Sequence, residues 1–264
     1  MARQFGSHLA GVDVAVARTL PELGERTEVR EIEALYLAAI AGGAEHTLYI
    51  ESQYLASRTL AEAIAARLRE DDGPEIVLVI PRNADGWLEQ KAMDGGARHD
   101  LLHLLWSADI HDRFGAFYPV TSSGAPIYVH AKVLVMDDRL LRIGSSNLNN
   151  RSMGFDTECD IAVESDDDAD VELRASIIGL RRRLLSEHLD VTEEEVDDAL
   201  GEQSLLSTVR ALATSDARSL REFDRNTVDG EDHVLAENAL MDPERTPPRL
   251  SDRIEGLRRL LGKR

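Results

Sequence analysis

Two side chains capable of phosphoryl chemistry, His130 and Lys132, stand two residues apart in a largely apolar run over residues 127–136. The run predicts a β-strand, in which alternate side chains point to the same face, so the two would lie about 7 Å apart on one face, together with Tyr128. An imidazole can act as a nucleophile or a proton donor, and an ammonium can neutralise charge that develops on phosphoryl oxygens. The pair therefore indicates a site that acts on a phosphate.

A second group of polar residues follows at fixed spacing. Asp137 begins a turn, and a strand predicted over 140–143 leads into Gly144, Ser145 and Asn147. Glycine lets the backbone approach closely, and a hydroxyl and an amide can donate hydrogen bonds to an anion. Together the residues read H-x-K-x4-D-x6-G-S-x-N, which a random sequence matches with a probability of roughly 10⁻⁸ per start position.

This pattern resembles the signature of the phospholipase D superfamily. Residues 49–54, Tyr-Ile-Glu-Ser-Gln-Tyr, resemble the segment Y-I-E-N-Q-F that lies between the two motifs of phospholipases D. Residues 147–153 and 156–158 resemble the run that follows their second motif. In all, residues 11–165 resemble the C-terminal half of a two-motif enzyme.

The resemblance implies a chemistry shared by two histidines, one of which forms a phosphohistidine while the other protonates the leaving alcohol and then activates water or an alcohol acceptor. It implies that His130 is the acid/base partner and that Lys132 and Asn147 hold phosphoryl oxygens, assisted by Ser145. Asp137 is expected to stabilise its turn. The resemblance implies neither a metal nor a cofactor.

A carboxylate 25–30 residues after the motif histidine usually orients the imidazole in this family. Glu158 is the expected residue and Asp156 the alternative. Gly144, Glu51 and Gln53 are expected to bind substrate.

Strands alternate with helices over the first 165 or so residues, which predicts a layered α/β/α domain with a mixed sheet and a helical C-terminal tail. The strands are expected at 12–19, 46–51, 75–80, 114–120, 127–136, 140–143 and 160–163, and the helices at 28–41, 59–69, 97–108 and from about 170 to 186. We expect a catalytic half-domain over residues 1–186 and a helical or polar region over 187–264.

The formal net charge is −19, which opposes binding to a nucleic-acid backbone. A phospholipid substrate with water or an alcohol as acceptor is therefore favoured, and no nucleic-acid partner is expected. We find no signal peptide and no apolar run long enough to span a membrane, so we expect a cytoplasmic or peripheral membrane protein.

The H-x-K-x4-D pattern occurs once, whereas the family chemistry needs two. Three alternatives remain: a homodimer that pairs two copies of His130, a truncated or non-catalytic half, and a half that pairs with a separate N-terminal half. A single-motif, nuclease-type phosphodiesterase acting as a homodimer is the alternative enzyme class.

Overall fold

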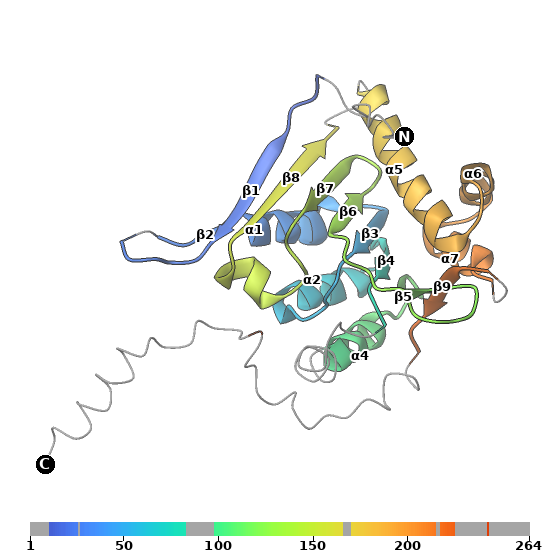
Figure 1. Cartoon of the computed structure of the whole chain (residues 1–264), viewed down its shortest axis with the longest axis horizontal. Helices are drawn as coiled ribbons and strands as arrows, with labels where there is room; N and C mark the ends of the chain where they lie inside the picture. Colours follow the sequence, from blue (N-terminus) through green and yellow to red (C-terminus); the bar gives the residue numbers. More distant parts are fainter. Residues whose placement is uncertain are drawn as a thin grey trace, which may run out of the picture.

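The protein is described by a computed structural model, which covers residues 11–25, 27–82, 98–165, 170–214, 217–224 and 242. In these residues nine strands form one mixed sheet, in the order β2-β1-β8-β7-β6-β3-β4-β5-β9 (Figure 1). The strands are β1 (Ala15–Leu20), β2 (Val29–Arg30), β3 (Thr47–Glu51), β4 (Glu75–Val79), β5 (Phe114–Val120), β6 (Val133–Met136), β7 (Leu140–Gly144), β8 (Glu158–Glu164) and β9 (Ser219–Glu222). Strands β3, β4 and β5 are parallel, and their other neighbours pair antiparallel.

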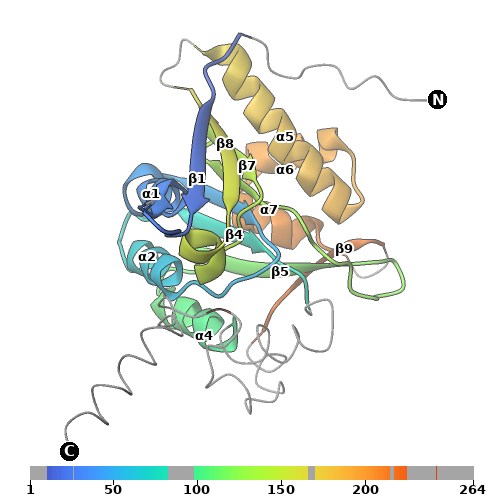
Figure 2. The same cartoon turned by 60° about the vertical axis from the view of Figure 1, so that its left-hand side comes forward.

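Helices cover both faces of this sheet, which confirms the predicted α/β/α layers (Figures 1 and 2). One face packs against α1 (Glu31–Ala38), α2 (Arg58–Leu68) and α4 (His99–Ala108). The other packs against α5 (Val171–Leu189), α6 (Glu193–Glu202) and α7 (Leu205–Leu212). No helix in the described ranges is long and apolar enough to cross a membrane.

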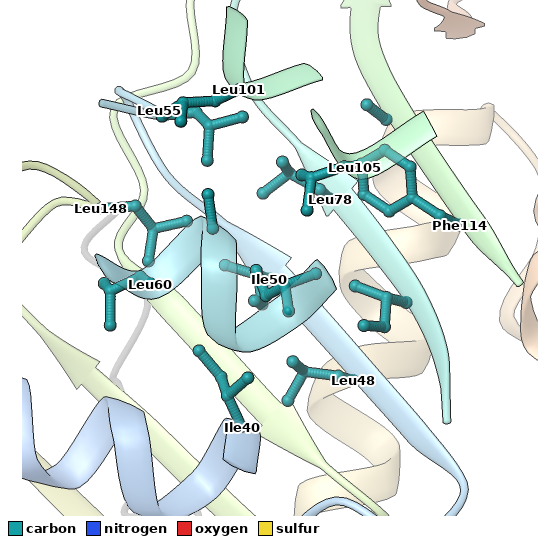
Figure 3. Close-up of a cluster of buried hydrophobic side chains, with 14 of the residues drawn as sticks. Ile40, Leu48, Ile50, Leu55, Leu60, Leu78, Leu101, Leu105, Phe114 and Leu148 are labelled. Atoms are coloured by element: carbon teal, nitrogen blue, oxygen red, sulfur yellow. The ribbon is translucent and has the colours of Figure 1, made fainter. Parts of the chain in front are cut away.

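The core on the α1 and α2 side follows from the spacing of apolar residues. In α2, Leu60, Ile64 and Leu68 recur every four residues and are fully or almost fully buried. They meet Leu48 and Ile50 of β3, as Figure 3 shows for the central part of the cluster. The helix begins where the side chain of Ser57 accepts a hydrogen bond from the backbone of Leu60.

The strand register brings the ends of four neighbouring strands, β3, β6, β7 and β8, to the same end of the sheet. Glu51 at the end of β3 pairs with Val133 at the start of β6, and Val133 pairs with Ile143 of β7. Ile143 pairs in turn with Ile161 of β8. Lys132, just before Val133, and Gly144, just after Ile143, therefore meet at this end of the sheet, where the Gly144 N–H donates to the Lys132 carbonyl.

Several predicted element bounds were wrong. The predicted strand 127–136 is a strand only over Val133–Met136, because β3 ends opposite Val133 and leaves residues 127–132 without a continuous partner. The first helix begins at Glu31, after the short β2, and its last residues form a π-helical turn, Ala39–Gly43.

The C-terminal region is not wholly helical or polar, because β9 adds a strand beside β5. A domain boundary at residue 186 stays a prediction, and α5 runs through that position. Apart from Asp242, the expectation for residues 225–264 lies outside the described residues.

Candidate active site

The segment before β6 presents His130 at the surface. His130 and Tyr128 are exposed, and their rings stack with centroids 6.3 Å apart and planes inclined by 19°. Val129 between them is 4% exposed and packs into the core on the α5 side. The predicted alternation therefore holds, although the segment is not a strand.

Lys132, unlike His130, is buried, with only 8% of the residue exposed. Its Nζ donates hydrogen bonds to Gln53 Oε1 at 3.1 Å and to the carbonyl of His130 at 2.9 Å. Burial lowers the pKa of Lys132 to about 8, against an opposing effect of the Glu158 carboxylate. The site thus holds an ammonium with few competing partners, which suits charge neutralisation on a phosphate.

Gln53 connects the side chains around Lys132. Its Nε2 donates to the hydroxyls of Tyr128 at 2.5 Å and Tyr54 at 2.7 Å. Its backbone N–H donates to Asn147 Oδ1 at 3.3 Å. The structure therefore brings Gln53 together with Lys132 and Asn147, and its role in substrate binding stays a prediction.

Asn147 is held by hydrogen bonds at its side chain and at its backbone. Its Oδ1 accepts from Gln53, and its backbone N–H donates to Ser152 Oγ at 3.0 Å. Within the described residues its Nδ2 makes no hydrogen bond, so this group is free to donate to a ligand. Lys132 Nζ and Asn147 Nδ2 are thus two donors linked through one glutamine.

Glu158 binds two serines and not the imidazole. Its Oε2 accepts from Ser145 Oγ, and its Oε1 accepts from Ser152 Oγ at 2.7 Å. No Glu158–His130 hydrogen bond forms among the described residues, so orientation of His130 by Glu158 stays a prediction. The alternative, Asp156, is paired with Arg151 at 2.7 Å.

The backbone N–H groups that follow β7 are used within the protein and do not point at an open anion site. The N–H groups of Ser145 and Ser146 both donate to Asp160, at 3.0 and 3.2 Å. Asp160 in turn forms a buried ion pair with Arg142. Neither residue was predicted from the sequence, where the signal was an arginine in the otherwise apolar β7 and an aspartate beside the apolar residues 161–163 of β8.

Glu51 does not join this group. It is 2% exposed and accepts a hydrogen bond from the Tyr49 hydroxyl at 2.6 Å. His188 Nε2 of α5 lies 3.2 Å from the same oxygen, so Glu51 faces α5 rather than Lys132. Burial, and then the charge of Glu51, raises the pKa of Tyr49. The geometry gives no support to a substrate-binding role for Glu51.

Asp137 lies at the opposite end of β6 from Lys132. Its carboxylate accepts three backbone hydrogen bonds, from Glu45, His46 and Thr47, at 2.7–2.8 Å. Asp137 and Asp138 form the turn of the β6–β7 hairpin with positive φ angles of 50° and 54°. These contacts support a structural role for Asp137.

The assembled group offers one exposed imidazole, one shielded ammonium and one amide. An imidazole can exchange a proton with a leaving or attacking oxygen, while the two donors bind non-bridging oxygens. The described residues around Lys132 contain no second histidine within hydrogen-bonding contact of the group. Among the described residues, the group around Lys132 therefore contains a single histidine, His130.

Two models of known protein families match the sequence of this chain. The model of the family described as cardiolipin synthase, PLD-like domain, matches residues 37–175, and the phospholipase D model matches residues 118–241. This chain belongs to the phospholipase D superfamily.

Individual relatives in the superfamily are distant and much longer. A phospholipase D of Phytophthora infestans is 22% identical over 73% of this chain and 13% of its own length. Phospholipase D A of Dictyostelium discoideum is 27% identical over 63% of this chain and 16% of its own length. The chain thus spans less than a fifth of the length of these relatives.

Among solved structures, phosphatidylserine synthase of Haemophilus influenzae Rd KW20 is similar with a TM-score of 0.49 and 15% identity, over 75% of this chain and 46% of that one. A likeness at this level adds no argument about activity.

Proposed function

We propose that this chain is a phospholipase D-type phosphodiesterase that hydrolyses or transphosphatidylates phospholipids. The observation that carries the proposal is the exposed His130 beside the shielded Lys132, with Gln53 linking Lys132 to Asn147. Membership of the superfamily supports the same chemistry.

In the proposed reaction, a histidine of a second motif attacks phosphorus and the headgroup oxygen leaves. The imidazolium of His130 gives its proton to that oxygen, so a neutral alcohol departs and a phosphohistidine remains. Neutral His130 then takes a proton from water or an acceptor alcohol as it attacks phosphorus, which releases the first histidine. Lys132 and Asn147 bind the non-bridging oxygens throughout.

In this proposal the second motif lies outside residues 1–264, either in a second copy of the chain or in an N-terminal half. The single H-x-K-x4-D pattern in the sequence supports this requirement. The net charge of −19 supports a lipid rather than a nucleic acid as substrate, because nucleic-acid enzymes need local basic grooves.

The test compares the wild-type chain with His130→Ala on phosphatidylcholine and on single-stranded DNA. Release of choline by wild type, alone or together with a polypeptide that carries another H-x-K-x4-D, is expected, and so is its loss by at least about 10²-fold in His130→Ala, since proton transfer contributes at least this much. His46→Ala is the matched control, because His46 is exposed at the far end of β3. Unchanged choline release in His130→Ala would rule out the site, and cleavage of DNA alone would rule out the substrate class.

A further inference from the structure

Arg142 and Asp160 form an enclosed ion pair directly beneath the strand end that precedes Asn147. Their side chains are 1% and 0% exposed, and Arg142 Nε lies 2.7 Å from Asp160 Oδ2. The guanidinium carbon of Arg142 lies 4.7 Å from the ring centre of Tyr36 in α1. A buried ion pair is a weak source of stability because desolvation offsets its attraction. Stability alone does not explain the pair, so we consider which other groups Arg142 and Asp160 bind.

Those contacts concentrate on the turn that carries the phosphate-binding residues. Asp160 Oδ1 accepts from the N–H groups of Ser145 and Ser146, at 3.0 and 3.2 Å. Asp160 Oδ2 accepts from the Ser146 hydroxyl at 2.6 Å, and Arg142 Nη2 donates to the Ser146 carbonyl at 3.0 Å. The residue before Asn147 is thus held at its N–H, its hydroxyl and its carbonyl.

Gly144 shows how closely the strand end is packed on this carboxylate. A Cβ atom at Gly144 would lie 1.9 Å from Asp160 Oδ1, well inside any contact distance. The position opposite Gly144 in the register is Asp160 itself. The glycine of the G-S-x-N pattern therefore makes room for Asp160.

We propose that Arg142 and Asp160 are positioning residues of the phosphate site, which fix the backbone from Ser145 to Asn147. Through this backbone they direct the Asn147 amide and the Ser145 hydroxyl, while neither side chain touches the substrate. Asp160 holds the turn, and Arg142 fixes and neutralises Asp160. The inference rests on the proposed function for its ligand, a phosphoryl group, but the geometry of the turn is testable without one.

Two double variants separate positioning from stability. Arg142→Met/Asp160→Asn removes both charges and keeps an acceptor oxygen for the two N–H groups. Arg142→Met/Asp160→Leu removes the charges and the acceptor, and an apolar replacement of a buried pair is often tolerated. The probe is tungstate, whose geometry resembles that of phosphate, together with the ¹H–¹⁵N signals of Ser145, Ser146 and Asn147.

The asparagine variant keeps an acceptor for the two N–H groups, so it is expected to shift these signals less, and to weaken tungstate binding less, than the leucine variant does. The leucine variant is expected to shift the signals and to weaken binding about tenfold, the effect of one misplaced hydrogen-bond donor. Arg139→Met/Glu164→Leu is the matched control, since Arg139 and Glu164 form an ion pair on the surface at the other end of the β7–β8 region.

A folded leucine variant with wild-type signals and affinity would overturn the proposal. If the leucine variant does not fold, Gly144→Ala provides the second test, because its methyl group would lie 1.9 Å from Asp160 Oδ1 and 2.6 Å from Asp160 Cα, so this contact must open and the same signals should shift. A wild-type chain that neither binds tungstate nor hydrolyses lipid contradicts the proposed function instead. The signals of residues 145–147 still decide the positioning role in that case.

Discussion

At the scale of single residues, the charge of Lys132 is the property most open to measurement. Burial lowers its pKa from 10.5 to about 8. The ammonium is therefore charged below pH 8 and loses its proton above it. We expect tungstate affinity to fall as the pH rises from 7 to 9, where only about a tenth of Lys132 stays protonated. Calorimetric titration at several pH values measures this.

Lys132→Arg is the control, because a guanidinium stays charged over this range. An equal fall of affinity in Lys132→Arg would assign the pH dependence to another group. The same shift also opposes folding, since the folded pKa lies below the unfolded one. This unfavourable contribution is fully present below pH 8 and is relieved as the pH rises toward 10.5.

The sequence predicted the motif residues better than their contacts. Glu51 and Gln53 would share a face if the strand continued, yet β3 ends at Glu51 and only Gln53 turns toward Lys132. The predicted end of the strand at Glu51 was right, but Gln53 is placed by contacts with Tyr128 and Asn147, which are distant in the sequence, and no local pattern contains them. The Arg142–Asp160 contact joins β7 and β8, so no local pattern contained it.

At the scale of elements, Asp137 joins the β6–β7 hairpin to the start of β3. Asp137→Ala removes the acceptor of three backbone N–H groups and is expected to lower the free energy of unfolding by about 1.5–3 kcal/mol, as for other hydrogen bonds to charged groups. Denaturant unfolding measures the loss. Choline release per folded molecule should remain, because the turn lies at the far end of β6 from Lys132.

Asp72→Ala is the matched control, since Asp72 is an exposed carboxylate on the loop before β4. An Asp137→Ala chain with wild-type stability and no activity would contradict the structural role and would indicate that Asp137 takes part in the reaction.

The elements with strong local signals were predicted with small errors. β4 is rich in β-branched residues and β5 contains three aromatic residues, and both lie within a residue of the predicted bounds. β9, Ser-Leu-Arg-Glu, has no such signal and becomes a strand only because β5 offers a free edge. Pairing between distant segments decides such an element, and the local sequence does not contain it.

At the scale of the whole molecule, an apolar row lies beside the site on the α5 face of the sheet. Val16, Ile161 and Ile143 pair in register across β1, β8 and β7, and they are 57%, 47% and 38% exposed. Their neighbours Leu141 and Val163 are covered by α5 and its cluster. The row ends next to Gly144, so a chain that covers it also reaches the site.

If a second copy supplies the missing histidine, this row is expected to lie in the contact between the two copies. Wild type should then sediment as a dimer of the 29.2 kDa chain, and Ile161→Glu should dissociate it and reduce choline release in parallel. Ile110→Glu is the matched control, because Ile110 is 68% exposed after α4 and outside the row.

The self-repulsion of two chains of charge −19 should make the dimer stronger at high salt, where that repulsion is screened. A monomeric wild type that still releases choline would contradict the second copy. A monomer that is inactive alone and gains activity with a polypeptide carrying another H-x-K-x4-D would assign the second motif to a separate half.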